Sequence, residues 1–392
     1  MKIKKISKTL YFLGQFFNKK TLKKLNFKLN DNATDKMDKA HIVLANHGSV
    51  MDYRITTFAM RKNKAYHVSA KNIFAGKKWL MQKVGGLPKV QFVPSLSLIK
   101  QVKQVLSNGN HVLVFPEGVM SFDGTNRIVP ESVAKLVKHI GVPVAVINIK
   151  GTYIAKPRYN ESKFNKISKL QADFDVILTE QQIAEMSVEQ IYAKIKQALY
   201  FNVWEWNKQN DVKAYGDFVT NLDYLLYECV YCNGQMTSQD GSYYCKKCGR
   251  QWKIDEYCRL HNASKELTIA QWFDYQRQNI NKQLKADEFC LHSQVKVQQL
   301  DGFKGFKEVG FGTFIQGANG VTFEGTIKGK DAQLTFEANK HWAVPAGNNF
   351  VELSQYGNTY RFLFKQKGYA IKSAIAVEES FKLAKGKKHM NF

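Results

Sequence analysis

Residues 41–54 read HIVLANHGSVMDYR, where an apolar run stops at Asn46 and His47, and Asp52 follows five positions after the histidine. A short apolar run bounded by polar residues predicts a buried strand. If the chain then turns into a helix, Asp52 lies close enough to bond one ring nitrogen of His47, which leaves the other nitrogen to accept a proton from a hydroxyl. A lone histidine near an acid can also be purely structural.

The same pattern recurs over roughly the first 205 residues, because short apolar runs alternate with amphipathic segments. Candidate strands cover residues 41–46, 111–116, 142–149 and 174–179, and candidate helices cover 95–109, 130–141 and 187–209. This alternation predicts an α/β core, a mostly parallel sheet flanked by helices. Ligand sites in such sheets lie at the carboxyl ends of strands. His47 and Glu117 each follow one of these predicted ends.

The two strand ends together resemble sequence blocks of a known family. Asn46-His47-x-Ser49-x-x-Asp52 is similar to the His-x4-Asp block of the glycerolipid acyltransferases, which include the lysophosphatidate acyltransferases. Phe115-Pro116-Glu117-Gly118-x-x-Ser121 is similar to their Phe-Pro-Glu-Gly block. Residues 84–93 and 141–153 take the places of the second and fourth blocks. The blocks occur in the family's order within the first 205 residues.

This resemblance implies a direct acyl transfer. His47, oriented by Asp52, would act as the general base on the hydroxyl of a lysophospholipid, foremost 1-acyl-glycerol-3-phosphate. The donor would be acyl-CoA, an acyl carrier protein thioester or an acyl phosphate, with no covalent acyl-enzyme and no other catalytic cofactor. Backbone amides near Gly118 or Gly48 would stabilise the oxyanion. The residues implied in substrate binding are Asn46, Ser49, Phe115, Pro116, Glu117, Gly118 and Ser121.

The chain departs from the family where an acceptor phosphate would be bound. Arginines usual in the second and third blocks are replaced within Lys89-Val90-Gln91 and Val119-Met120-Ser121. Lys89, Arg127 or Arg158 would supply the missing charge, lysine as a point charge and arginine as a fork. Taken individually, each of the three is better explained as a surface charge. Another lysolipid or a glycolipid therefore stays open as the acceptor.

Charge and hydropathy point to a membrane surface. The chain carries a formal charge of +25, and residues 1–30 contain nine lysines, no acid and several phenylalanines. Such a segment predicts an interfacial helix on an anionic membrane; the alternative is a helix packed on its own domain. No apolar run is long enough to span a membrane, and no secretory signal is evident. We expect a cytoplasmic protein, peripheral on the inner face of the cell membrane.

The cysteines predict a structural metal site. Cys229-x2-Cys232 and Cys245-x2-Cys248 are twelve residues apart, the spacing of a zinc ribbon that binds Zn2+ with four thiolates. A redox pair is the alternative. We expect Cys258 and Cys290 to be buried. Basic residues around the ribbon raise the question of nucleic acid, but no basic aromatic groove accompanies them, so we expect a spacer or docking module.

Period-two alternation after residue 290 predicts a small antiparallel β domain. The predicted organisation is a membrane segment (1–30), an acyltransferase domain (31–215), a zinc ribbon (227–258), a connecting helix (259–289) and the β domain (290–392). A basic tail would end the β domain at Lys382, Lys385, Lys387 and Lys388. The competing hypothesis is a catalytically idle zinc-ribbon adaptor. The paired His47 and Glu117 blocks favour the enzyme, because an adaptor needs neither.

Overall fold

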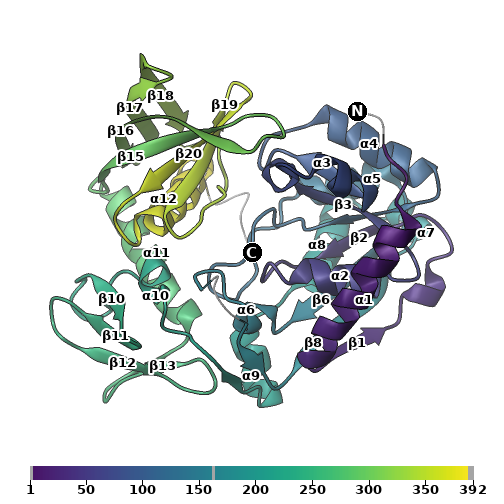
Figure 1. Ribbon diagram of the computed structural model, residues 1–392, viewed down its shortest axis with the longest axis horizontal. Helices are drawn as coiled ribbons and strands as arrows, with labels where there is room; N and C mark the ends of the chain where they lie inside the picture. The colour runs from purple at the N-terminus through teal and green to yellow at the C-terminus, as the bar shows by residue number, and fades with distance from the viewer. Residues whose placement is uncertain (1–2, 161–163, 387–392) are drawn as a thin grey trace. The chain divides into compact units, whose positions relative to one another are not determined.

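The computed structural model describes residues 3–160 and 164–386, which form two compact units (Figure 1). Unit 1 comprises Met1–Val90 and Pro94–Gly216, and unit 2 comprises Gln91–Val93 and Asp217–Phe392. Two residues at the start of the predicted membrane segment, Met1 and Lys2, lie outside the described residues. The same holds for Lys387 and Lys388 of the predicted basic tail.

Unit 1 is built on a seven-stranded sheet with the order β1-β8-β6-β2-β5-β3-β4. All its neighbouring strands pair in parallel except β6 and β8. The predicted α/β core with a mostly parallel sheet is therefore confirmed, while β1, β3 and β4 were not predicted as strands. The strands are β1 (Phe27–Asp31), β2 (Ile42–Ala45), β3 (Ala65–Ala70), β4 (Gly86–Lys89), β5 (His111–Val114), β6 (Val144–Lys150) and β8 (Leu170–Leu178).

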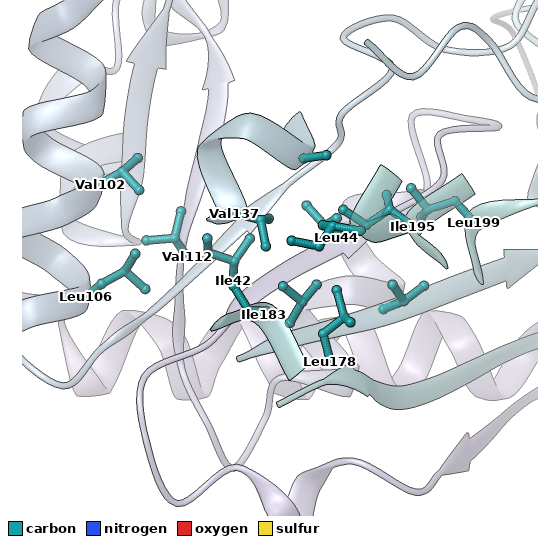
Figure 2. Close-up of a cluster of buried hydrophobic side chains, with 14 of the residues drawn as sticks. Ile42, Leu44, Val102, Leu106, Val112, Val137, Leu178, Ile183, Ile195 and Leu199 are labelled. Atoms are coloured by element: carbon teal, nitrogen blue, oxygen red, sulfur yellow. The ribbon is translucent and has the colours of Figure 1, made fainter. Parts of the chain in front are cut away.

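A hydrophobic cluster covers one face of this sheet (Figure 2). Because side chains alternate along a strand, Ile42 and Leu44 of β2 share that face and meet Val137 and Ile195 from the covering helices. Each fully buried aliphatic side chain stabilises the fold by about 1.5–3 kcal/mol. The covering helices are α4 (Leu96–Ser107), α5 (Ser132–Ile140), α7 (Glu180–Glu185) and α8 (Val188–Leu199).

Helices α1 (Lys8–Lys24) and α2 (Asp52–Ala59) pack on each other, and α2 contacts β6. The buried Tyr11 hydroxyl of α1 donates to the carbonyl of Met60 at 3.0 Å. Phe12, Phe16 and Phe17 lie on the other side of α1 and remain 71%, 60% and 62% exposed. One side of the helix therefore packs on unit 1, as the alternative interpretation expects, and the other presents phenylalanines to the surroundings. Contact of this helix with a membrane stays a prediction.

The predicted long helix over 187–209 is wrong in one respect, since it forms two helices, α8 and α9 (Val203–Asn210). Asn202 has an extended backbone, and its side chain accepts hydrogen bonds from the amides of Trp204 and Glu205. An asparagine in this role begins a new helix. The break follows from tertiary contact as well, because the Phe201 amide donates to Asn126 at 2.5 Å.

Short elements complete unit 1, and among the described residues no helix is long and apolar enough to cross a membrane. Strands β7 and β9 pair with each other. The short elements are η1 (Thr34–Lys36), η2 (Lys71–Phe74), α3 (Lys78–Lys83), α6 (Thr152–Ala155), β7 (Lys166–Ile167) and β9 (Ala214–Tyr215).

Unit 2 begins with α10 (Leu222–Leu225) and a small sheet that holds the four cysteines, followed by α11 (Ile269–Lys285). Helix α11 starts with a capping box formed by Thr268 and Gln271. Its fully buried Trp272 packs on Trp252 of the small sheet, with ring centroids 4.6 Å apart. The strands are β10 (Met236–Gln239), β11 (Ser242–Cys245), β12 (Gln251–Ile254), β13 (Leu260–His261) and β14 (Glu266–Leu267).

The rest of unit 2 is the predicted antiparallel β domain, a six-stranded sheet ordered β18-β17-β16-β15-β20-β19. Helix α12 (Tyr369–Lys385) follows it and was not predicted. Residues 370–377 read AIKSAIAV and are mostly buried, so they lack the polar stripe of an amphipathic helix. The strands are β15 (Leu291–Leu300), β16 (Phe306–Gly317), β17 (Gly320–Ile327), β18 (Lys330–Glu337), β19 (Phe350–Gln355) and β20 (Asn358–Phe364).

Helix α12 contacts β19, β20 and α11. Arg277 of α11 donates to Glu378 at 3.0 Å and to Glu379 at 2.8 Å, and both acids are nearly fully buried. The expected burial of Cys258 is confirmed, whereas Cys290 is exposed, contrary to the expectation.

Candidate active site and metal centre

The catalytic candidates lie where two neighbouring strands end. Strands β2 and β5 pair in parallel with Leu44 opposite Val114, so their carboxyl ends lie at the same edge of the sheet. His47 follows β2 and Glu117 follows β5. The fold thus brings together two turns that are seventy residues apart in the chain.

His47 and Asp52 form the expected pair. Nδ1 of His47 lies 2.8 Å from Oδ2 of Asp52, and the aspartate side chain is fully buried while that of His47 is 20% exposed. Asp52 is the first residue of α2, and its Oδ2 also accepts the amide of Ser49 at 2.9 Å. With Nδ1 bonded to a carboxylate, the remaining nitrogen of His47, Nε2, is the one available to a substrate proton.

Ser49 and Asn46 hold the turn from within. The Ser49 hydroxyl donates to the carbonyl of Lys156 at 2.9 Å. The Asn46 side chain donates to the carbonyl of Ile149 at 2.8 Å and accepts its amide at 2.6 Å, so it extends the pairing of β2 with β6 beyond the strand end. Both residues are buried, and these contacts fix the backbone on either side of His47.

The Phe-Pro-Glu-Gly turn and Ser121 after it form two hydrogen bonds with the main chain of His47. The His47 amide donates to Oε1 of Glu117 at 3.1 Å, and the Ser121 amide donates to the His47 carbonyl at 2.8 Å. The ring of Phe115 stacks on the imidazole, with centroids 4.2 Å apart. Pro116 is buried, and the Gly118 amide closes the turn by donating to the Phe115 carbonyl at 3.1 Å.

Glu117 is the most strongly perturbed acid of the site. Only 1% of it is exposed, and burial raises its pKa from 4.5 to about 7. Hydrogen bonds oppose this shift, because its Oε2 accepts the Arg127 amide at 2.6 Å and its Oε1 accepts the Asn126 side chain at 3.3 Å. These contacts join the Phe-Pro-Glu-Gly turn to the loop that carries Arg127.

Two of the three predicted phosphate-binding cations come together. The guanidinium carbons of Arg127 and Arg158 lie 4.5 and 5.0 Å from the ring centroid of the buried Phe122. Arg158 also donates to the Met120 carbonyl at 3.4 Å. Lys89 ends β4, which β3 separates from β5, and burial lowers its pKa. Arg127 and Arg158 thus form one cationic group, and Lys89 lies elsewhere along the sheet edge.

A pocket beside His47 includes residues that carry no sequence signal. Asn126 lies in a loop, and its side chain also donates to the Leu199 carbonyl at 3.0 Å. Phe201 comes from the break between α8 and α9, which the sequence did not predict. Only long-range contact places both beside the histidine. The pocket is lined by Asn46, His47, Gly48, Glu117, Ser121, Gly124, Thr125, Asn126, Ile149, Thr152, Tyr153 and Phe201.

The four cysteines of unit 2 converge on one point. The sulfurs of Cys229, Cys232, Cys245 and Cys248 all lie within 4.8 Å of one another. Cys229 and Cys248 are 3.9 Å apart at sulfur, and Cys232 and Cys245 are 3.5 Å apart. Four sulfurs about 2.3 Å from a tetrahedral ion would be separated by roughly 3.8 Å. The residues present therefore fit a metal ion.

The chain around the cysteines has the repeated geometry of two metal knuckles. The Asn233 amide donates to the Cys229 carbonyl at 2.9 Å, and the Gly249 amide donates to the Cys245 carbonyl at 3.0 Å. Gly234 leaves room for the sulfurs, because a Cβ there would lie 3.0 Å from the Cys245 sulfur and 2.5 Å from Cβ of Lys247.

Comparison with known proteins gives one family match. Residues 24–150 match the family model described as Acyltransferase. The crystal structure of the 1-acyl-sn-glycerophosphate acyltransferase of Thermotoga maritima aligns with a TM-score of 0.41 and 19% identity, covering 48% of this chain and 76% of that one. A Ran-binding domain from Ashbya gossypii aligns with a TM-score of 0.20 and 17% identity, covering 24% and 92% of the respective chains. No curated protein matches.

Proposed function

We propose that this chain transfers a fatty acyl group to the hydroxyl of a lysophospholipid, and the match of residues 24–150 to the Acyltransferase family model supports an acyl transfer. The observation that carries the proposal is the 2.8 Å contact between Nδ1 of His47 and the buried carboxylate of Asp52. That contact fixes the tautomer of His47 and leaves Nε2 as the base.

The reaction proceeds in one transfer. Nε2 of His47 removes the proton of the acceptor hydroxyl, and Asp52 stabilises the imidazolium that forms. The alkoxide oxygen attacks the acyl carbonyl, the bond to the thioester sulfur or phosphate oxygen breaks, and the proton leaves with that group. The Gly118 amide already donates to Phe115, so the Gly48 amide is our candidate for stabilising the oxyanion.

We assign the acceptor's phosphate to Arg127 and Arg158, and thus favour 1-acyl-glycerol-3-phosphate among lysophospholipids. Both guanidinium groups lie near Phe122. Residues 124–126 line the pocket beside His47, and Arg127 directly follows them. Guanidinium groups bind phosphate through two parallel hydrogen bonds, which makes a pair of them selective for a phosphomonoester. Glu117 then acts mainly on His47 and Arg127, because it bonds the amides of both.

We propose that the metal of unit 2 is zinc and that it is structural. Four thiolates fill a tetrahedral zinc and leave no position for water or substrate. Its separation in sequence from the His47 and Glu117 turns agrees with a role in folding unit 2. Zinc would hold the two knuckles together, and Trp252 and Trp272 would pack behind them.

The experiment is an acyl-transfer assay with purified full-length protein, lysolipid acceptors in mixed micelles and each class of acyl donor. We expect transfer by the wild type and a loss of at least about a hundredfold in His47→Ala. His292→Ala is the matched control, because His292 is an exposed histidine of β15 in unit 2. No transfer to any lysolipid by the wild type, or equal transfer by His47→Ala, would reject the proposal.

A further inference from the structure

Unit 1 carries a second exposed apolar surface, on the segment between β3 and β4. Ile73 of η2 and Trp79 and Leu80 of α3 are 47%, 59% and 40% exposed. We call these three residues the α3 face. Exposed apolar side chains that cluster within a few residues indicate a contact surface.

The α3 face belongs to a well-anchored segment. Phe74, between Ile73 and α3, is fully buried and packs so closely on Gly86 of β4 that a Cβ at that glycine would lie 2.9 Å from its ring. Gln82 on α3 is buried as well. Since the segment is fixed to the sheet on its inner side, the outward position of Trp79 is set by the fold.

The charge around this face has one sign. Residues 53–116 contain eleven lysines and arginines and no acidic residue. Lys77 and Lys78 are exposed at the start of α3, directly before Trp79. Tryptophan beside lysine suits the boundary of a bilayer, where the ring lies among the headgroups and the ammonium groups meet anionic lipids.

The segment that carries the α3 face contacts the start of α1, the helix with the exposed phenylalanines. The Ser7 amide, at the start of α1, donates to the carbonyl of Lys83, the last residue of α3, at 2.8 Å. Ile6 packs at Gly85, where a Cβ would lie 3.0 Å from its side chain. The start of α1 and the end of α3 are thus in contact within unit 1.

We infer that the α3 face is a second contact with an anionic lipid bilayer, which acts together with α1. An acidic protein is the other class of partner that positive charge suits. The bilayer is favoured because three large apolar side chains, one of them tryptophan, are exposed beside the lysines. Two contacts on one unit would fix how unit 1 is oriented on the membrane, which a single helix does not.

The test measures binding of full-length protein to vesicles of phosphatidylcholine alone or mixed with phosphatidylglycerol. We expect the triple variant Ile73→Ser, Trp79→Ser, Leu80→Ser to bind mixed vesicles at least about tenfold more weakly than the wild type, because each buried apolar side chain contributes to partitioning. Lys77→Glu with Lys78→Glu should weaken binding to mixed vesicles most at low salt. Phe311→Ser is the matched control, because Phe311 is 66% exposed on β16 of unit 2.

Brominated lipids provide a readout that does not depend on a drastic variant. They should quench the fluorescence of the wild type, and Trp79→Phe should remove that quenched component while binding persists. Equal binding by the triple variant, or quenching unchanged in Trp79→Phe, would overturn the inference. If the triple variant loses binding to a purified acidic carrier protein but still binds vesicles, the inference is overturned in favour of a protein partner.

This inference extends the proposed function to the surface on which its lipid substrate lies. The two fail separately, since vesicle binding is measured without an acyl donor. A chain that binds vesicles through Trp79 but transfers no acyl group would reject only the enzymatic proposal.

Discussion

Glu117 accepts the main-chain amide of His47 at 3.1 Å, so the acid of one sequence block holds the backbone of the histidine from the other. The same carboxylate accepts the Arg127 amide at 2.6 Å. Glutamine at this position has one acceptor oxygen in place of two, so it cannot satisfy both amides. We expect Glu117→Gln to lower kcat by about 10- to 100-fold, since small displacements of a base are costly. An unchanged kcat would show that Glu117 does not position His47.

The pKa of Glu117 predicts how stability depends on pH. Burial raises this pKa from 4.5 to about 7, so the folded protein binds the proton more tightly than the unfolded chain. The resulting stabilisation is complete below pH 4.5 and is lost as the pH rises through 7. Relative to Glu117→Gln, the wild type should lose up to about 3 kcal/mol across this window. Hydrogen exchange of the β2 amides, corrected for intrinsic rates, measures the difference, and parallel pH profiles would contradict it.

Asp52→Asn should leave the turn folded and disable the base. The asparagine oxygen can still accept the Ser49 amide, but an amide does not hold His47 in the required tautomer or stabilise its imidazolium. We expect kcat to fall by roughly 10²- to 10⁴-fold with little change in the KM of the acceptor. Asp35→Asn is the control, because that aspartate side chain is 93% exposed. A loss of only a few-fold in Asp52→Asn would argue against the pair.

The two arginines predict a selectivity for phosphate. Arg127→Lys and Arg158→Lys retain the charge but not the fork, so each should raise the KM for 1-acyl-glycerol-3-phosphate by about tenfold. Transfer to a monoacylglycerol, which lacks phosphate, should change little. The double variant should deviate from additivity, because both groups lie near Phe122. If Lys89→Met raises this KM and the two arginine variants do not, the phosphate is bound at Lys89 instead.

Zinc should be present at about one ion per chain, and chelation should disturb the tryptophans behind the knuckles. Trp272 is fully buried against Trp252, so its fluorescence should shift to longer wavelength on metal removal. Gly234→Ala should weaken zinc binding by at least about tenfold, since the new Cβ would lie 2.5 Å from Lys247. Gly317→Ala is the matched control, because its nearest neighbour is 3.7 Å away. Metal-free protein with unchanged fluorescence would reject the site.

The sequence predicted those features that depend on local pattern. Strand β2, the turn at His47, the cysteine knuckles and the hairpins of the β domain each show a period, a turn residue or a spacing that needs no tertiary information. The α/β core follows from the alternation of such elements. The proximity of His47 and Glu117 was predictable as well, because parallel strands end at a common edge.

Other features depend on contacts between distant residues. The break before α9 is fixed partly by Asn126, which lies far from it in the sequence. Helix α12 is buried along much of its surface, so no polar stripe marks it. The grouping of Arg127 with Arg158 required two loops to meet at Phe122. Neither the hydropathy pattern nor the spacing of residues predicts these long-range contacts.

Helix α11 has a mechanical consequence for unit 2. It has 17 residues and so spans roughly 25 Å at 1.5 Å per residue. Trp272 near its start packs on the cysteine module, and Arg277 further along is paired with two buried acids of α12. Because α11 is held at both points, the cysteine module and the β domain should move as one rigid body. A ligand that binds the cysteine module would therefore also determine the orientation of the β domain, and the reverse holds as well.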